Sequence, residues 1–352
     1  MTKRVTKKNV SSRIWLSILI AAIVGYIAHQ YTDIFVELSA YKLNEEEIKL
    51  LKKALLEQTV IVHEQICSRT SNFCYTIKDY VTMDNEDFIV VRVMELNSAQ
   101  NIIFSGAHLT FPKEITKEKL HTKTWPINKR KLTSIYTRMM VGMSFAMEGL
   151  EFDTTSTQNV LMIGLGGGVI NNFLSTLGPE MMINLTTVEL DSDMLSAAID
   201  WFQFNETHNN RVVIDDGIIF IRDASERGDK YKAIIIDACY SELRPLCCPV
   251  EGFYNPDTIA DISNILEENG IVSVNVVTTS EKNTSKKEQI MAAYKKHFTS
   301  CSYTIISPQQ QVLFCTHRKK WSYHEQESRF QRNLQRVDQT FDFQLKNSYT
   351  IH

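Results

Sequence analysis

The segment that most constrains the fold is VLMIGLGGGVINNF, which runs from Val160 to Phe173. A short apolar run breaks into glycines at positions 164, 166, 167 and 168 and then resumes with helical spacing, which predicts a strand, a tight turn and a helix. Glycine accepts backbone angles that other residues resist and lets the main chain approach a ligand closely. The free N–H groups of the following helix would face that ligand. The segment therefore predicts a cofactor-binding turn.

The residues after the glycines discriminate among the cofactors that such turns bind. A phosphate-binding P-loop would place Lys and Ser or Thr after the last glycine, whereas Val169, Ile170 and Asn171 follow here. The nicotinamide fingerprint G-x-G-x-x-G would need its third glycine at Val169. The pattern disfavours an NTPase and a dinucleotide enzyme, and it favours an S-adenosylmethionine site.

An acidic residue follows the second predicted strand, in NLTTVELDSDML, where Val188 is succeeded at once by Glu189. A carboxylate about 20 residues or more past the first glycine accepts hydrogen bonds from the ribose hydroxyls of an adenosine. We predict this role for Glu189 and predict that Asp191 or Asp193 caps the next helix. The alternative is that all three acids serve the helix start.

Composition places few limits on function. The 352 residues are 43% hydrophobic and 22% charged, which fits one large or two modest folded domains. The net charge of −3 and the lack of a basic face interleaved with aromatic residues argue against nucleic acid as a partner. The sequence has no C-x-x-C pair and no His at metal-ligand spacing, so we predict no metal site.

The first 31 residues differ from the rest. The apolar run IWLSILIAAIVGYIA at 14–28 is preceded by five basic residues, and no acidic residue appears before Asp33. Although the run is shorter than the roughly 20 residues of a comfortable span, we predict an uncleaved single-pass anchor with a cytosolic N-terminus and a lumenal or extracellular domain. The alternative is secretion after cleavage of a signal peptide. Cleavage prefers small residues at both positions of an A-x-A-like site, and Tyr26 with Ala28 fits that pattern badly.

Two further features bear on this topology. Sequons at Asn184, Asn205 and Asn283 permit glycosylation in a secretory compartment without establishing it. Cys67 and Cys74 flank a polar SRTSNF turn between strand-like runs, which predicts either a hairpin disulfide or two ordinary thiols.

The rest of the chain is predicted in three regions. Region 32–131 begins with a helix over about 45–57, continues as a small antiparallel sheet and ends in a polar loop over 112–131. Region 132–320 holds the cofactor domain, which opens with a helix over 132–150. Region 321–352 is a polar tail with one possible helix and no discernible chemistry.

Seven ordered stretches carry a resemblance to a known family: IGLGGG, VELDSDML, WFQF, DDGIIFI, IIIDACYSE, GIVSVNVV and VLFC. From about Leu132 to Lys320 the chain resembles the spermidine-synthase-like class I methyltransferases, and among them the elongation-factor lysine and N-terminal methyltransferases. The resemblance implies an α/β fold, namely a Rossmann-like seven-stranded class I methyltransferase sheet with a small N-terminal β-rich region. It also implies S-adenosylmethionine as cofactor.

The resemblance extends to site residues. In that family an Asp-Gly pair after the third strand holds the adenine edge, which corresponds to Asp216 and Gly217, although Asp215 departs from the commoner Ala. The predicted cofactor-binding residues are therefore Gly164, Gly166, Gly168, Glu189, Asp216, Gly217 and Asp237.

The fourth predicted strand ends with Asp237, at the sheet edge where ligands of open α/β sheets collect. We predict Asp237 and Tyr240 as the catalytic, acceptor-side residues. Polyamine synthases would need a second acid three residues after Asp237 to take a proton from the amine, and Tyr240 stands there instead. Methyl transfer needs mainly alignment of the acceptor, so it is the better fit.

The predicted function is therefore an S-adenosylmethionine-dependent methyltransferase of unknown acceptor, either a protein amine or a small molecule, and an oligomer is possible. The alternative is a non-catalytic, membrane-anchored protein that kept the fold, because S-adenosylmethionine is chiefly a cytosolic metabolite and the domain is predicted to lie across the membrane. Polyamine synthesis is the third, less favoured interpretation.

Overall fold

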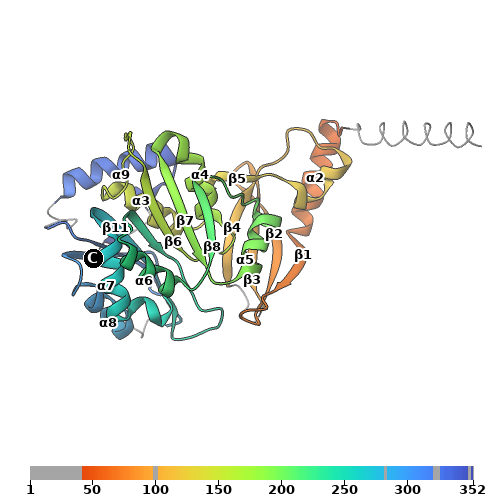
Figure 1. Cartoon of the computed structure of the whole chain (residues 1–352). Coiled ribbons are helices and arrows are strands. Elements are labelled where there is room, and N and C mark those ends of the chain that lie inside the picture. The colour runs from red at the N-terminus through yellow and green to blue at the C-terminus, as the bar shows by residue number, and fades with distance from the viewer. Residues whose placement is uncertain (1–41, 98–101, 281–283, 320–325, 348–349, 352) are drawn as a thin grey trace, which may run out of the picture. The chain divides into compact units, whose positions relative to one another are not determined.

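A computed structural model of the chain describes residues 42–97, 102–280, 284–319, 326–347 and 350–351 (Figure 1). The chain divides into two compact units, one of residues up to Glu57 with Phe111–Trp125, the other of Gln58–Thr110 with the residues from Pro126 onward. The predicted anchor at 14–28 lies outside the described residues. Within the described ranges, every helix is too short or too polar to cross a bilayer.

The first unit contains the helix α2 (Glu45–Gln58), close to the predicted span. It begins with a capping box, in which Asn44 Oδ1 accepts a hydrogen bond from the Glu47 N–H and Glu47 Oε2 accepts one from the Asn44 N–H. Part of the predicted loop forms two short 3₁₀ helices, η1 (Lys117–Leu120) and η2 (Thr122–Thr124). The buried Trp125 closes this segment by donating its indole N–H to the Lys119 carbonyl at 2.8 Å.

The second unit begins with a five-stranded antiparallel sheet in the order β1-β2-β3-β4-β5. The strands are β1 (Val60–Cys67), β2 (Cys74–Asp84), β3 (Asp87–Leu96), β4 (Ile103–Leu109) and β5 (Ile127–Leu132). A disulfide joins Cys67 and Cys74, which are paired residues of the β1–β2 hairpin, so the hairpin disulfide is confirmed. The predicted polar loop over 112–131 is wrong at its end, because Ile127 and Leu132 are buried and pair with β4.

The larger sheet has the order β14-β12-β13-β11-β9-β6-β7-β8, with β10 beside β11. Neighbouring strands from β11 to β8 are parallel and β13 is antiparallel. Seven of these strands form the predicted Rossmann-like class I methyltransferase sheet, and the short β10 and β14 are additions. The bounds are β6 (Gln158–Ile163), β7 (Ile183–Glu189), β8 (Asn210–Ile214), β9 (Tyr231–Ile236), β10 (Leu246–Cys248), β11 (Leu266–Thr278), β12 (Ser300–Ile305), β13 (Gln310–Thr316) and β14 (Thr350–Ile351).

Helices cover both faces of this sheet (Figure 1). Alternate residues of β6 divide between the two cores, since Val160 and Met162 join one and Leu161 and Ile163 join the other. One face carries α3 (Ile135–Ala146), α4 (Val169–Met181) and α9 (Glu327–Phe341), and the other carries α6 (Gly217–Arg227), α7 (Pro256–Ile265) and α8 (Thr284–Tyr294). The remaining helical segments of the unit are α5 (Ser192–Phe202), η3 (Glu251–Tyr254) and η4 (Leu345–Asn347).

The helix α9 belongs to the core, although its sequence is mostly polar. Phe330, Leu334, Val337 and Phe341 repeat at helical spacing and are all buried in the cluster beneath α3 and α4. The ring of Phe341 contacts those of Phe145 and Phe173. The predicted tail therefore contributes one wall of the cofactor domain.

A buried ion pair joins the small sheet to α5. The Arg92 guanidinium of β3 donates two hydrogen bonds of 2.9 Å to the Asp79 carboxylate of β2, and both side chains are at most 1% exposed. Arg92 Nη1 also donates to the Trp201 carbonyl at 3.0 Å. Because a buried charge is costly unless its hydrogen bonds are made, this arrangement fixes how the small sheet meets α5.

Candidate functional site

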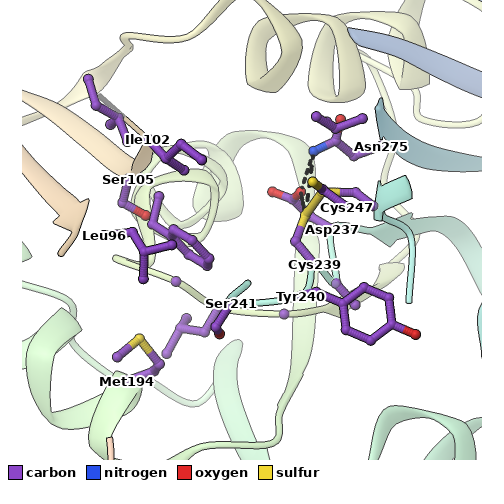
Figure 2. Close-up of a pocket in the computed structure, with 18 of the residues that line it drawn as sticks. Leu96, Ile102, Ser105, Met194, Asp237, Cys239, Tyr240, Ser241, Cys247 and Asn275 are labelled. Atoms are coloured by element: carbon purple, nitrogen blue, oxygen red, sulfur yellow. Dashed lines mark hydrogen bonds between the residues drawn. A yellow bond between two sulfur atoms is a disulfide. The ribbon is translucent and has the colours of Figure 1, made fainter. Parts of the chain in front are cut away.

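A cavity of about 1140 Å³ lies within the second unit, where the small sheet faces the carboxyl ends of β6, β7 and β9. Its wall includes Leu96 and Ser105 from the small sheet, and Asp237 and Asn275 stand on the opposite side (Figure 2). The cavity is large enough for a cofactor and part of an acceptor, because small-molecule sites occupy about 300–1,000 Å³.

The glycine turn lines this cavity through Gly164 and Gly166, whereas the predicted site residue Gly168 does not line it. The φ angles of these three glycines are positive, at 91°, 54° and 66° in chain order. A Cβ atom on Gly164 would lie 2.5 Å from the Asp237 carbonyl oxygen, and one on Gly166 would lie 2.9 Å from Ser105 Oγ. The turn thus needs glycine for both conformation and close approach. Immediately after it, α4 begins with its N-terminal end towards the cavity, since Val169 and Ile170 also line the wall.

Glu189 ends β7 at the cavity wall, with 8% of its surface exposed. Its carboxylate accepts hydrogen bonds from the backbone N–H groups of Leu165 at 2.7 Å and Asp191 at 2.9 Å. Burial raises the pKa of Glu189, and these hydrogen bonds oppose that shift. Asp191 caps α5 by accepting from the Asp193 N–H, which confirms the predicted cap. The ribose role of Glu189 stays a prediction.

The Asp216–Gly217 pair lies where α6 begins, and both residues line the cavity. Asp216 caps the helix by accepting a 2.8 Å hydrogen bond from the Ile218 N–H. A Cβ on Gly217 would lie 2.7 Å from Ile163 Cγ2, so glycine lets the helix approach β6 closely. The structure brings the pair to the same cavity as the glycine turn, and its adenine role remains a prediction.

Asp237 lines the cavity at the carboxyl end of β9. Its two oxygens accept hydrogen bonds from the Tyr136 hydroxyl at 3.2 Å and from Asn275 Nδ2 at 2.8 Å, the second of which is drawn in Figure 2. Gln310 Nε2 in turn donates to Asn275 Oδ1 at 3.3 Å. Burial raises the pKa of Asp237, and the hydrogen bonds from Asn275 and Tyr136 oppose that shift. Burial and the nearby Asp237 also hold the pKa of Tyr136 well above its ordinary value, so Tyr136 remains a donor.

Sequence reasoning missed both partners of Asp237. Tyr136 lies in α3, whose spacing indicated only core packing, and Asn275 lies within the apolar strand β11. A polar residue inside the run GIVSVNVV was the available signal for Asn275. Such a residue in a buried strand needs a hydrogen-bond partner.

Tyr240 lines the cavity but turns its ring away from Asp237 (Figure 2). Its hydroxyl accepts a 3.1 Å hydrogen bond from the Glu251 N–H, and the Arg244 guanidinium lies 4.0 Å from the ring centroid. The structure therefore places Tyr136, and not Tyr240, against the Asp237 carboxylate. Tyr240 forms part of a wall loop that a Cys239–Cys248 disulfide closes.

The described charged side chains that line the cavity are all acidic. Among the described residues that line it there is no Lys, Arg or His, whereas the acidic side chains number five. They are Glu189, Asp191, Asp216, Asp237 and Glu242. A wall of this kind attracts cations and repels phosphates. It suits a sulfonium or an amine and disfavours a nucleotide with a phosphate chain.

The sequence model of the spermine/spermidine synthase domain matches residues 133–342. The eEF1A lysine and N-terminal methyltransferase homolog of Drosophila pseudoobscura pseudoobscura is 30% identical over 184 residues, which are 52% of this chain and 27% of that protein. The polyamine aminopropyltransferase of Vibrio vulnificus is 30% identical over 135 residues, 38% of this chain and 42% of that protein. The chain thus spans less than half the length of either relative.

Solved structures share the fold. Human methyltransferase-like protein 13, in complex with SAH, superposes with a TM-score of 0.50 at 23% identity, over 58% of this chain and 92% of that chain. A probable spermidine synthase from Corynebacterium glutamicum superposes with a TM-score of 0.54 at 13% identity, over 82% of this chain and 94% of that chain.

Proposed function

Because this chain belongs to the spermine/spermidine synthase domain family, we propose that it is an S-adenosylmethionine-dependent methyltransferase. The observation that carries the proposal is the cavity, which joins a glycine turn at a helix start to a wall of carboxylates without a described cation. Relatives named as methyltransferases support methyl transfer as the reaction.

The residues present fit the cofactor. The positive-φ turn leaves room for a ligand against the main chain, and α4 offers its N-terminal N–H groups to a carboxylate. Glu189 would hold the ribose, Asp216 and Gly217 the adenine edge, and the turn the amino-acid part. S-adenosylmethionine supplies a methyl group on a sulfonium centre that is already a good leaving group. The enzyme then needs chiefly to orient the acceptor and to keep water out.

Asp237 is the group that meets the acceptor. Tyr136 and Asn275 fix its carboxylate by hydrogen bonds from two sides, and burial raises its pKa. A carboxylate of raised pKa accepts a proton more readily at neutral pH, so Asp237 takes the proton from an acceptor amine. Tyr240 belongs to the acceptor-side wall. The acceptor is an amine of a protein or of a small molecule.

Aminopropyl transfer is the second candidate, which the Vibrio relative and the lack of a described cation for the cofactor carboxylate favour. Against it, the position three residues after Asp237 carries Tyr240, whose hydroxyl is engaged with the Glu251 backbone. A non-catalytic role would leave unexplained why Asp237 lines the cavity with both its oxygens hydrogen-bonded.

For cellular placement we propose the membrane anchor at 14–28, with the cofactor domain, 132–320, across the membrane from a cytosolic N-terminus. Three disulfides support this topology: Cys67–Cys74, Cys239–Cys248 and Cys301–Cys315. Disulfides persist in oxidising compartments and are rare in the cytosol. The alternative of a secreted, cleaved form predicts the same disulfides and a shorter chain.

Calorimetric titration of the full-length chain with S-adenosylmethionine, SAH and NAD⁺ tests the cofactor assignment. We expect binding of the first two and none of NAD⁺, whose phosphates the acidic wall repels. Transfer from labelled S-adenosylmethionine to cellular amines then tests the reaction. Asp237→Asn should retain SAH binding and lose transfer by about a hundredfold or more. Asp200→Asn, on the exposed side of α5, is the matched control. Tight binding of NAD⁺ and none of SAH would exclude the proposal.

A further inference from the structure

Of the seven cysteines, six are paired, and one pair stands directly at the cavity. The Cys239–Cys248 disulfide closes a loop that starts two residues after Asp237 and ends in β10. Most residues of this loop line the cavity: Cys239, Tyr240, Ser241, Glu242, Leu243, Cys247 and Cys248. The cross-link therefore controls the shape of the cavity wall rather than a distant part of the surface.

Besides the disulfide, the loop is held where β10 pairs with β11 and where the Tyr240 hydroxyl accepts a 3.1 Å hydrogen bond from the Glu251 N–H. Within it the Tyr240 N–H donates to the Cys247 carbonyl at 2.9 Å. Across the cavity, the Tyr75 hydroxyl of β2 donates to Ser241 Oγ at 2.9 Å. Tyr75 is itself buried and packs edge-on against Phe104, so its hydroxyl is held in place for the hydrogen bond to the loop. The disulfide is the covalent restraint that joins the start of the loop to β10.

We propose that the Cys239–Cys248 disulfide is a positioning element of the cofactor and acceptor cavity, so that the cavity is competent only in the oxidised protein. This inference rests on the proposed function. Reduction by a dithiol would break the Sγ–Sγ bond, give each cysteine a proton and an electron, and convert the reductant into its own disulfide. The loop would then lose its closure against Tyr75.

The effect reaches Asp237 through the chain. Cys239 Sγ lies 3.9 Å from Asp237 Oδ1 and 4.0 Å from Asn275 Nδ2, so the cross-link and the acceptor-side carboxylate share one packed corner. Freedom at Cys239 loosens the backbone two residues from Asp237. A ligand that binds only when the loop is ordered against the cavity then loses apparent affinity, because ordering the loop on binding costs conformational entropy.

The Cys301–Cys315 disulfide provides the matched control. It also links two cysteines, but it joins β12 to β13 inside a ladder that continues on both sides, and neither residue lines the cavity. Its removal tests the loss of a disulfide without a change of the cavity wall.

The experiment compares the full-length chain with the double variants Cys239→Ser/Cys248→Ser and Cys301→Ser/Cys315→Ser. SAH affinity is measured by calorimetry, and loop opening by the rate at which a glutamyl endopeptidase cleaves after Glu242, which is exposed inside the closed loop. We expect the first variant to bind SAH about tenfold more weakly and to be cut faster. The second variant should match the parent in both measurements.

A reciprocal measurement separates positioning from simple stabilisation. If oxidation tightens SAH binding about tenfold, SAH must make the Cys239–Cys248 bond harder to reduce by the same factor, which is about 30 mV in a dithiothreitol titration. The Cys301–Cys315 bond should show no such shift. Mass spectrometry of alkylated thiols in the parent measures the reduction of each disulfide with and without SAH. This measurement needs no variant, so it remains decisive if a variant fails to fold.

Two outcomes would overturn the inference: unchanged SAH affinity and cleavage in the loop variant, or equal reduction of the loop disulfide with and without SAH. Failure of the proposed function looks different. In that case the oxidised parent binds no SAH at all, and the rate of glutamyl-endopeptidase cleavage after Glu242 still reports whether the disulfide holds the loop.

Discussion

Replacement of Gly164 by alanine should be far more damaging than the same replacement at Gly228, although both glycines have positive φ angles, 91° and 74°. Gly228 ends α6, and a Cβ there would meet nothing within 4 Å. At Gly164 the new Cβ would lie 2.5 Å from the Asp237 carbonyl oxygen. The pair therefore separates the cost of the backbone conformation from the cost of the close approach.

The magnitudes follow from the contacts. An alanine at positive φ costs about 1–2 kcal/mol, and this term is common to both variants, as is the lower entropy of the unfolded chain. At Gly164 the backbone must also move, which costs about 1–3 kcal/mol more for an overpacked site. Relief is restricted because the Gly164 N–H donates to Val188 and the Asp237 N–H donates to Ile163, at 2.8 and 2.9 Å. The expected losses are about 2–5 kcal/mol at Gly164 and about 1–2 kcal/mol at Gly228.

Urea unfolding of the oxidised protein, followed by far-ultraviolet circular dichroism, measures both free energies. SAH titration of the folded variants gives a second readout, because Gly164 also shapes the cavity and Gly228 does not. Losses that agree within about 0.5 kcal/mol would refute the reasoning, since the close contact at Gly164 would then carry no cost. A Gly228→Ala variant that loses more than Gly164→Ala would refute it more strongly.

Four other predictions address the site, the pH response and the topology. Glu189→Ala should weaken S-adenosylmethionine binding roughly ten- to a hundredfold in calorimetry, because a lost hydrogen bond to a charged group costs about 1.5–3 kcal/mol. Undiminished binding by a folded variant would show that Glu189 does not bind the ribose. Burial, with nearby positive charges, lowers the pKa of His108 from 6.5 to about 4. The unfolded chain therefore binds the proton more readily, and the free energy of unfolding should fall as the pH drops through this interval. Urea titrations at several pH values should show a weaker pH dependence for His108→Gln than for the parent, and equal pH dependence would contradict this. Putrescine with decarboxylated S-adenosylmethionine should yield no spermidine by chromatography, and turnover of about 1 per second or faster would show that aminopropyl transfer is the reaction. In sealed microsomes the domain should resist protease. A glycan is expected on the exposed Asn205 rather than on Asn184, because the Asn184 Nδ2 is engaged as a donor to Asn159 at 2.8 Å. Digestion without detergent would place the domain in the cytosol.

The sequence was sufficient for features that are local. The glycine turn, the acid after β7 and the Asp-Gly pair at α6 each combine a residue type with an adjoining strand or helix, and all of them reach one cavity. Their convergence follows from the parallel sheet, because the carboxyl ends of parallel strands meet at the same edge. The paired Cys67 and Cys74 were also recognisable, since a single hairpin brings them together.

The features that escaped prediction depend on contacts between distant segments. Tyr136 and Asp237 are 101 residues apart, and no local pattern in α3 distinguishes a tyrosine that reaches the site from one that fills the core. The choice of Cys248 over its neighbour Cys247 as the partner of Cys239 depends on the bulge where β10 joins β11. The burial of α9 was obscured because charged residues separate its four apolar positions.

The burial of α9 also sets an order of events during biosynthesis. A ribosome extends a chain by about 5–20 residues per second and releases its early segments first. The hairpin closed by Cys67 and Cys74 is complete long before Phe330, Leu334, Val337 and Phe341 emerge to fill the core between α3 and α4. The nascent chain must therefore keep the apolar faces of these helices from aggregating until synthesis has passed residue 341. The early cysteines are therefore available for pairing before the cofactor domain can pack.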